Sequence, residues 1–426
     1  MTDQGTTHGD RRLSTKEAAE LLGVKPETVY AYVSRGQLSS RRGPGARGST
    51  FDAKEVEALA RRNRREPAAP TTANELSVRT RITLIDKDRY YFRGVDATEL
   101  ALNHSYEEVA EWLWTGTLRP GIGFTAPEET AAAARRAVDA LPEHSGPTDR
   151  LRVAAISAAT ADPLRFDLSE EAVIGTGRTL IPTLVAALPP VLSGDRDGGP
   201  LARRLWARLT GRKPDDAALH ALDTALALLV DHDLAASTLA VRVAASARAH
   251  PYAAVSAGLG VLEGPLHGAA SALAHRMLID VLDRGSAGPV VADELRAGRR
   301  VPGLGHRLYP GEDPRAQALF ALLEVMPKAG PALAAARDVV ATTARHTDLH
   351  ANVDLALAVL TVSSGMPAEA GETIFAVART AGWIAHALEE YGERPLRMRP
   401  SGQYVGLRPP QPLPAPGTPG AASATP

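Results

Sequence analysis

The sequence predicts a mostly α-helical protein in which a small N-terminal domain precedes a large helical body. Alanine and leucine are abundant, whereas aromatic residues make up only 4% of the 426 residues, a composition typical of helical proteins. Residues 127–250 form successive amphipathic segments separated by proline and glycine turns. No alternation of strands and helices is visible there, so a mainly helical fold is favoured over a parallel α/β fold.

Composition excludes several classes of function. The formal net charge is -1, so the whole molecule is not a general binder of polyanions. The absence of cysteine excludes disulfides, thiolate catalysis and cysteine-ligated metal sites. The first residues lack the apolar core of a secretory signal, and no apolar run reaches the roughly 18 residues that span a membrane. We therefore expect a cytoplasmic protein without a membrane partner.

Residues 13–65 indicate a separate helix-turn-helix domain. A capping box beginning at Ser14 marks the start of a first helix, and a tight turn at Gly23 separates it from a second helix. Residues 38–51 suggest a basic hairpin, or wing, and a third helix is expected over residues 53–63. This pattern resembles the winged helix-turn-helix of excisionase and mercury-resistance-regulator proteins.

The charge of this domain leaves its partner open. Residues 1–66 hold 13 Lys and Arg against 9 Asp and Glu, an excess that suits weak DNA binding through residues 13–65. The alternative is a protein–protein docking module. The following residues, 67–75, have the composition of a linker.

The body opens with short strands over residues 78–92 and a helical region that begins near Thr98. Six further helices are expected from apolar spacing and from proline positions, over Tyr106–Leu118, Glu128–Leu141, Leu151–Ala159, Ile174–Ala187, Pro200–Leu209 and Pro214–Val230. Residues 408–426 are rich in proline and of low complexity, so they are predicted to be disordered.

Residues 301–315 are the first candidate site. The stretch from Val301 to His306 is rich in glycine and proline, so its backbone can turn tightly and approach a ligand closely. Asp313 followed by Pro314 indicates a helix start, which fixes Arg315 in the first turn. A His that donates a hydrogen bond and an Arg that grips a carboxylate together suit an oxo-acid. The alternative is a turn with a solvated Arg and a structural His.

Two further residues suit proton chemistry. His267 lies between glycines before an apolar helix, where the helix dipole disfavours its cation; a neutral imidazole suits the stabilisation of an enolate. Asp354 precedes the apolar run 355–362, and desolvation there would make it a stronger base. The alternatives are a structural His and an ordinary helix-capping Asp.

Several segments occur in the order found in one enzyme family. They are Asp231-His232-Asp233, Gly264-Pro-Leu-His-Gly268, Gly303-Leu-Gly-His306 with Asp313-Pro-Arg315, Asn352-Val-Asp354, and Phe375-Ala-Val-Ala-Arg379. Together they resemble the citrate synthase family over roughly residues 76–407. The resemblance implies a citrate synthase fold behind the winged domain at 1–66, with a large domain of residues 76–270 and 376–407 and an inserted small domain of residues 271–375.

The resemblance also implies a role for each matching residue. Asp354 would take a proton from the methyl group of acetyl-CoA, His267 would stabilise the enol or enolate, and His306 would hydrogen-bond the carbonyl of oxaloacetate. The implied substrate-binding residues are His232, Arg315, Phe375, Arg379 and Arg399. The implied acyl-CoA contacts are Val301, Gly303, Leu304, Gly305 and Arg307.

By this resemblance the enzyme makes citrate and CoA, the entry reaction of the tricarboxylic acid cycle, with no metal and no tightly bound cofactor. It would be a homodimer in which Arg399 reaches the partner's site, although Arg394 or Arg397 could be the equivalent residue. Two alternatives stay open. One is a 2-methylcitrate synthase that uses propionyl-CoA. The other is a DNA-binding regulator whose synthase-like body senses a metabolite.

Overall fold

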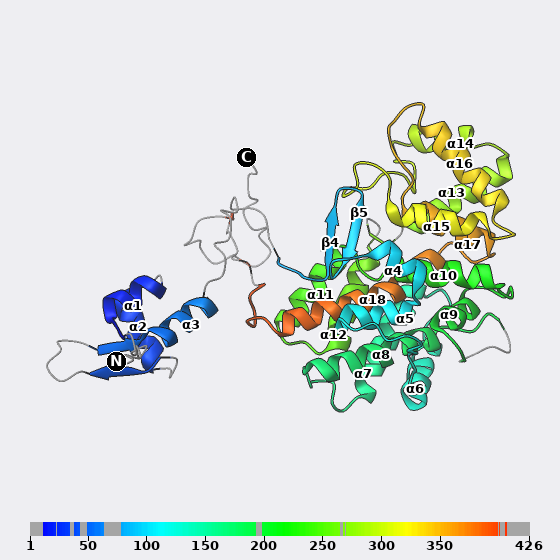
Figure 1. The fold of residues 1–426 in the computed structure, drawn as a ribbon. Helices are drawn as coiled ribbons and strands as arrows, with labels where there is room; N and C mark the ends of the chain where they lie inside the picture. Colours follow the sequence, from blue (N-terminus) through cyan, green and yellow to red (C-terminus); the bar gives the residue numbers. More distant parts are fainter. Residues whose placement is uncertain are drawn as a thin grey trace, which may run out of the picture. The chain divides into compact units, whose positions relative to one another are not determined.

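The computed structural model describes two compact units, which lie within residues 1–79 and 80–426 (Figure 1). The described residues are 12–22, 24–34, 38–42, 49–63, 78–192, 198–264, 267–268, 270–398, 400 and 405–406. No helix among them is long and apolar enough to cross a membrane. Two predicted segments lie outside these residues: the linker at 67–75 and the disordered tail at 408–426.

The first unit is a helix-turn-helix with a small antiparallel sheet. Its elements are β1 (Arg12–Ser14), α1 (Thr15–Leu22), α2 (Pro26–Ser34), β2 (Ser40–Arg42), β3 (Ser49–Asp52) and α3 (Ala53–Asn63). β2 and β3 pair as the predicted wing, and β1 adds a third strand to β3. The predicted capping box is present, because Ser14 donates to the Glu17 carboxylate and accepts from the Glu17 amide. Phe51 and Val56 are fully buried in a core separate from that of the second unit.

The second unit is almost entirely helical. It begins with a three-stranded antiparallel sheet of β4 (Thr83–Asp86), β5 (Arg89–Phe92) and β6 (Val95–Asp96). Its helices are α4 (Ala97–Asn103), α5 (Tyr106–Thr115), α6 (Glu128–Asp139), α7 (Pro147–Ala161), α8 (Glu170–Ala187), α9 (Leu201–Leu209), α10 (Asp216–Leu228), α11 (Ala236–Ser246), α12 (Pro251–Leu262), α13 (Ala270–Arg284), α14 (Ala287–Arg296), α15 (Pro314–Glu324), α16 (Gly330–Thr343), α17 (Val353–Ser363) and α18 (Ala370–Tyr391).

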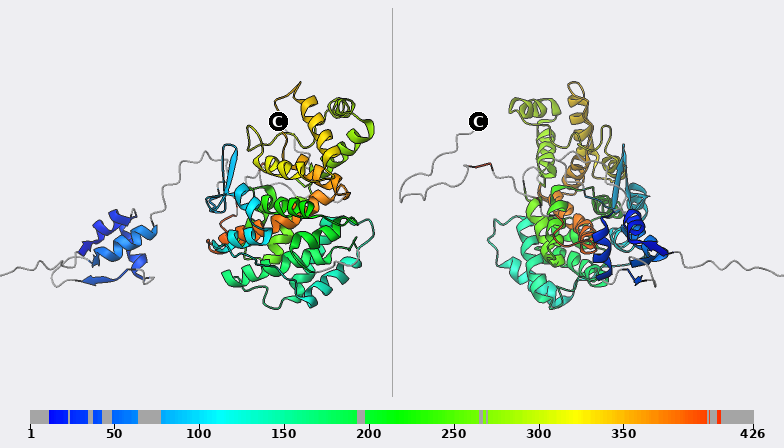
Figure 2. Two further views of the ribbon diagram at one scale, coloured as in Figure 1. Left: turned by 45° about the vertical axis from the view of Figure 1, so that its right-hand side comes forward. Right: turned by 90° about the vertical axis from the view of Figure 1, so that its left-hand side faces the viewer.

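The helices of this unit form two groups. Helices α13 to α17 pack mainly on one another, and Figures 1 and 2 show α13–α16 gathered at one end of the unit. In the other group α18 runs through the middle and packs on α5, α7, α8, α11 and α12. The candidate site residues lie in the segment before α11, in the segments before α13 and α15, in the first turns of α15 and α17, and in the N-terminal half of α18.

Caps explain where individual helices begin and end. Ser105 and Glu108 form a capping box that starts α5, and Gly116 ends it in the left-handed conformation with φ 70°, which glycine adopts without strain. The sequence-based end of this helix at Leu118 was therefore three residues too late. Helix α10 starts after Asp215, whose carboxylate caps it, so Pro214 lies before the helix.

Small residues let the central helix approach its neighbours. Trp383 on α18 is fully buried, and a side chain added at Gly258 of α12 would lie 2.9 Å from its ring. At Gly382 an added Cβ would lie 2.2 Å from the carbonyl oxygen of Val230. Because nothing larger than glycine fits there, α18 packs directly against the backbone that leads into Asp231 and His232.

Candidate active site

The glycine loop at 301–306 is hydrogen-bonded to the segment that carries Asp354. The Gly305 amide donates to the His350 carbonyl at 2.8 Å, and the Asn352 amide donates to the Gly303 carbonyl at 3.0 Å. Gly303 and Gly305 both have φ 78°, and a Cβ at Gly303 would lie 2.8 Å from that of Leu355. The loop needs glycine for both reasons, and its pairing holds His306 close to α17.

Asn352 is the cap that sets the start of α17. Its side-chain oxygen accepts from the amides of Asp354 and Leu355, and its side-chain nitrogen donates to the Gly305 carbonyl at 2.9 Å. Asp354 is thus the second residue of the helix and its carboxylate is not used as a cap. The carboxylate is available for chemistry, which removes the capping alternative left open by the sequence.

The surroundings of Asp354 make it a better base than an ordinary carboxylate. Burial is the main cause that raises the pKa of Asp354 to about 6; the charge of Arg315 opposes it, and the neighbouring Asp313 carboxylate adds a smaller upward contribution. A carboxyl with this pKa is mostly deprotonated at pH 7 and yet accepts a proton more readily than a solvated one.

His306 is a neutral hydrogen-bond donor in this arrangement. Burial and the positive charge of Arg315 lower the pKa of His306 to about 4. Its Nδ1 accepts from the Leu308 amide at 3.1 Å, so the single proton of the neutral ring is on Nε2. Nε2 is the atom with which His306 can polarise a carbonyl oxygen.

His232 and Tyr309 form a buried pair next to His306. His232 Nε2 lies 2.7 Å from the Tyr309 hydroxyl, and the His232 ring lies 5.1 Å from that of His306, centroid to centroid. Burial, followed by the charges of Arg315 and Arg379, lowers the pKa of His232 well below its usual value. His232 comes from the helical group containing α18 and His306 from the other group, so the pair joins the two.

Arg315 is buried and is held by its own helix cap. Asp313 accepts from the Arg315 backbone amide and from Arg315 Nε and Nη2, at 2.9 and 2.8 Å for the two side-chain atoms, and also from the Val353 amide. The Arg315 side chain is 3% exposed. Two of its donor atoms are therefore already bound, and Arg315 can offer a ligand only its remaining donors and its charge.

Arg379 and Phe375 lie on one face of α18. The guanidinium carbon of Arg379 is 4.5 Å from the centre of the Phe375 ring, and Arg379 Nε donates to the Leu229 carbonyl at 2.9 Å. Burial lowers the pKa of Arg379 to about 10, so it stays charged at neutral pH. A second desolvated cation is thereby fixed beside His232 and His267.

His267 lies opposite Ser237, which is fully buried on α11. Its Nε2 is 2.8 Å from the Ser237 hydroxyl, and its ring stands edge-on to Phe375 with centroids 6.0 Å apart. Burial and then the charge of Arg379 lower the pKa of His267. The lowered pKa favours the neutral imidazole expected from the sequence, and burial and the charge of Arg379 are its causes.

The residues predicted to contact acyl-CoA differ in their exposure and in whether their backbone polar groups are already hydrogen-bonded within the protein. Val301 is buried in the core, Leu304 is partly buried, and Arg307 is exposed. The Gly303 carbonyl and both polar groups of Gly305 are bonded to residues 350–352. Arg399 lies outside the described residues, whereas Arg397 is held by both carboxylate oxygens of Glu390. Among the described residues no cluster is suited to hold a metal ion.

The site thus combines a carboxyl group with a raised pKa, histidines with lowered pKa values and two buried arginines. This combination suits the condensation of an enolate with an oxo-acid. The family model described as "Citrate synthase, C-terminal domain" matches residues 72–401, and "Helix-turn-helix domain" matches residues 12–64. The chain belongs to the citrate synthase family. It is an acyltransferase of the citrate and 2-methylcitrate synthase type, whose members act on acyl-CoA without a tightly bound cofactor.

Individual relatives support the same assignment. The chain is 32% identical to the citrate synthase of Haloferax volcanii over 78% of this chain and 94% of that one. It is 29% identical to 2-methylcitrate synthase 2 of Corynebacterium glutamicum over 74% of this chain and 88% of that one. The crystal structure of the Thermotoga maritima citrate synthase superposes with a TM-score of 0.64 at 27% identity, covering 80% of this chain and 96% of that one.

Sequence reasoning missed three residues of this site. Ser237 and Tyr309 contact His267 and His232 across 30 and 77 residues of sequence, and no local pattern announces either contact. Asp313 was identified only as a helix cap. Its position two residues before Arg315 was the available signal, because one carboxylate at that spacing can bind both the amide and the side chain of the Arg.

Proposed function

We propose that the second unit condenses acetyl-CoA with oxaloacetate to give citrate and CoA. The observation that carries this proposal is that one site contains a carboxyl group with a raised pKa and a histidine with a lowered pKa. The pKa of Asp354 is raised to about 6 and that of His306 is lowered to about 4. The carboxylate is thus ready to accept a proton, while His306 can donate a hydrogen bond without giving its proton away at neutral pH.

In the proposed reaction Asp354 takes a proton from the methyl group of the thioester. His267 hydrogen-bonds the thioester carbonyl oxygen and stabilises the enol or enolate that forms. The methyl carbon then bonds to the keto carbon of oxaloacetate, whose oxygen accepts a hydrogen bond from His306 Nε2. That oxygen takes up one proton in place of the one that Asp354 removed and becomes the hydroxyl of citryl-CoA, and Asp354 releases its proton and returns to the carboxylate form. Water then cleaves the thioester, which releases citrate and CoA.

The acceptor is held by charge. We infer that Arg315 and Arg379 bind the carboxylates of oxaloacetate, and that His232 and Phe375 line the same pocket. Both guanidinium groups are buried, so their attraction for a carboxylate is little screened by solvent. Arg399 of the partner subunit would supply a third cation in a homodimer.

A test compares acetyl-CoA with propionyl-CoA, each with and without oxaloacetate, by following the free CoA thiol. Because the chain contains no cysteine, a thiol reagent detects the released CoA alone. We expect oxaloacetate-dependent release with a higher kcat/KM for acetyl-CoA. A reversed preference would make the protein a 2-methylcitrate synthase. Propionyl-CoA has one methylene more than acetyl-CoA, and a pocket distinguishes the two by about 1–3 kcal/mol of binding free energy, which is enough to set the preference. No release with either thioester would favour a sensor body.

We further propose that the first unit binds duplex DNA. The match to a helix-turn-helix domain supports this proposal, and so does strand β2, which carries Arg41 and Arg42 and pairs with β3. The exposed side chains of Tyr30 on α2 and Arg41 on β2 are available to a partner.

A further inference from the structure

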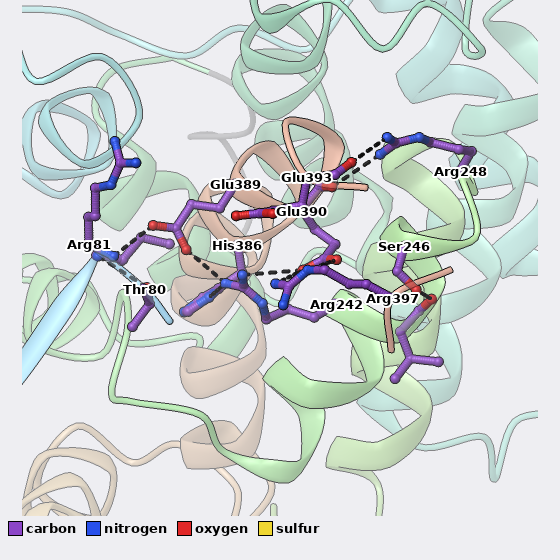
Figure 3. A network of polar contacts seen from close by, with 12 residues as sticks. Thr80, Arg81, Arg242, Ser246, Arg248, His386, Glu389, Glu390, Glu393 and Arg397 are labelled. Atoms are coloured by element: carbon purple, nitrogen blue, oxygen red, sulfur yellow. Dashed lines mark hydrogen bonds and ion pairs between the residues drawn. The ribbon is translucent and has the colours of Figure 1, made fainter. Parts of the chain in front are cut away.

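Figure 3 shows a network of charged residues between α11 and the end of α18, none of which is assigned to catalysis. Its centre is Arg242 of α11, whose side chain is 1% exposed. Arg242 Nη1 donates to Glu389 Oε2 and to His386 Nδ1, both at 2.8 Å, and its Nη2 lies 3.2 Å from Glu390 Oε2. All three partners lie in the last turns of α18, so Arg242 ties α11 to the end of that helix.

One branch of the network leads to the site. A guanidinium cannot accept a hydrogen bond, so His386 Nδ1 is the acceptor and the proton of the neutral ring is on Nε2. That Nε2 lies 3.2 Å from Asp231 Oδ1, and the other oxygen of Asp231 accepts from the Thr83 hydroxyl. Both His386 and Asp231 are fully buried. Asp231 directly precedes His232, so its anchorage also fixes the backbone of the substrate-binding His.

The other branch leads to the C-terminal segment. Glu390 is fully buried and accepts from Arg397 Nε and Nη2 at 2.8 and 2.7 Å. The Leu396 amide donates to the Ser246 carbonyl of α11 at 2.8 Å. Arg397 precedes Arg399 by two residues, so this branch fixes the point from which the predicted trans-acting residue starts.

A buried network of charges contributes little to the free energy of folding. The desolvation penalty of the charged groups is about as large as their mutual attraction, and apolar residues of the same volume often stabilise a core as well or better. What buried ion pairs do provide is a single geometry, since any displacement leaves a charge without its partner. We therefore attribute to the network a role in fixing the positions of the residues that it contacts, rather than a role in stability.

We propose that Arg242 and His386 are positioning residues that hold His232 and the C-terminal segment in one fixed relation. Arg242 directs the His386 proton towards Asp231 and thereby fixes His232, and through Glu390 and Arg397 it fixes the segment that leads to Arg399. Neither Arg242 nor His386 touches substrate in this scheme. The effect on oxaloacetate binding rests on the proposed function; the effect on the chain itself does not.

The first test uses two substitutions of His386. In His386→Gln the side-chain amide nitrogen can reach the position of Nε2 and donate to Asp231. In His386→Asn the amide reaches only the position of Nδ1, so Asp231 Oδ1 loses its contact with the side chain at 386 and keeps only the Thr83 hydroxyl on its other oxygen. Amide hydrogen exchange of Leu229 and Val230, which close α10 directly before Asp231, should accelerate about ten- to hundredfold in the Asn variant. The Gln variant should retain most of the protection.

The second test addresses the other branch. Arg397→Gln should accelerate exchange of the Leu396 amide and leave Leu229 and Val230 at the wild-type rate. Arg337→Gln, which breaks an exposed ion pair with Glu324, is the matched control and should change neither. Wild-type exchange at Leu229 and Val230 in His386→Asn would overturn the proposal, and so would loss of protection at both places in Arg397→Gln, because that result indicates general destabilisation.

Kinetics then separate this inference from the proposed function. If the protein condenses acetyl-CoA with oxaloacetate, His386→Asn and Arg397→Gln should each raise KM for oxaloacetate about tenfold or more. KM for acetyl-CoA and kcat should change little, and His386→Gln should restore KM. A wild-type protein without oxaloacetate-dependent turnover would refute the proposed function, while the exchange rates would still decide the positioning role. A fall in kcat accompanied by an equal rise in KM for both substrates would contradict the positioning role.

Discussion

The carboxyl group of Asp354 has to be deprotonated to act as a base, and its surroundings determine the pH at which this happens. Because the pKa of Asp354 is raised to about 6, kcat/KM should fall about tenfold per pH unit below pH 6 and level off above it. His306, with its pKa lowered to about 4, stays neutral over this range and adds no second inflection. A pH profile of CoA release checks this, and a kcat/KM that does not fall between pH 6 and pH 5 would contradict the role of Asp354 as a base with this raised pKa.

Replacement of the base tests the same role without titration. Asp354→Asn keeps the size of the side chain and the Asn352 cap, so the fold should be retained, but an amide does not accept the methyl proton. We expect kcat to fall by about 10²–10⁴. Circular dichroism verifies the fold, and near-normal turnover in the purified variant would remove Asp354 from the mechanism.

The sequence indicated which residues are candidates for chemistry, but it gave little information about their surroundings. His306, Asp354 and Arg315 occur in short motifs whose local chemistry is visible in the sequence. The pairing of Arg315 with Asp313 follows from spacing, although the sequence alone did not show that this pairing occupies two of the Arg donors. The contacts of Ser237 and His386 depend on helices brought together by the fold, so no sequence pattern within reach of either residue could indicate them.

Helices α5 and α10 carry a pair of desolvated carboxyls, Glu107 and Asp223. Burial and then the charge of Glu107 raise the pKa of Asp223 to about 7, and Asp223 Oδ1 accepts from the Tyr106 amide. The folded state therefore binds a proton that the unfolded state, with an ordinary pKa near 4, has released by pH 5. Asp223 contributes stability below its unfolded pKa, and this contribution is lost as pH rises through about 7.

Asp223→Asn should remove this pH dependence while keeping an acceptor for Tyr106. Between pH 5 and pH 8 the free energy of unfolding of the wild type should fall by about 2–3 kcal/mol more than that of the variant. Urea unfolding at both pH values measures the difference. Asp216→Asn, which removes an exposed carboxyl from the same helix, is the control. Parallel pH dependence in wild type and Asp223→Asn would contradict this account.

Elements were predictable where local signals were strong. The helices α3 and α15 begin as predicted because Asp52 and Asp313 bind the first amides of each. Helix α8 begins at Glu170, four residues earlier than predicted, since its first two residues are exposed glutamates that contribute nothing to the apolar spacing. Strand β1 was not expected at all, because three residues are too few to show alternation and their partner strand lies about 40 residues away.

The whole molecule is proposed to be a dimer with shared active sites. If Arg399 acts in the partner's site, a mixture of Arg399→Ala and Asp354→Asn protomers forms heterodimers in which one of the two sites is intact. We expect turnover to recover on mixing, to about a quarter of the wild-type level if protomers combine at random. No recovery after subunit exchange has been demonstrated by mass spectrometry would place Arg399 in its own subunit's site or outside both.

The last prediction concerns the first unit, which has its own core and a linker to the enzyme. One winged unit offers few phosphate contacts, so a single unit should bind DNA weakly and lose affinity with salt. Two units on one dimer would add their contacts, because binding of the first raises the effective concentration of the second. We therefore expect the full-length protein to shift duplex DNA at about 50 mM salt, where phosphate contacts are strongest, and a protein that begins at Asn74 to fail.

The cations of the wing should determine this binding. Of the three arginines in this region, Arg41 and Arg42 lie on β2, and Arg47 lies outside the described residues. Replacing all three by Gln should lower affinity for every DNA sequence to a similar degree and flatten the dependence on salt, because phosphate contacts carry no sequence information. Condensation rates should be unchanged, since the wing contributes nothing to the proton chemistry. Equal DNA binding by full-length and truncated proteins would instead assign the unit to a protein partner.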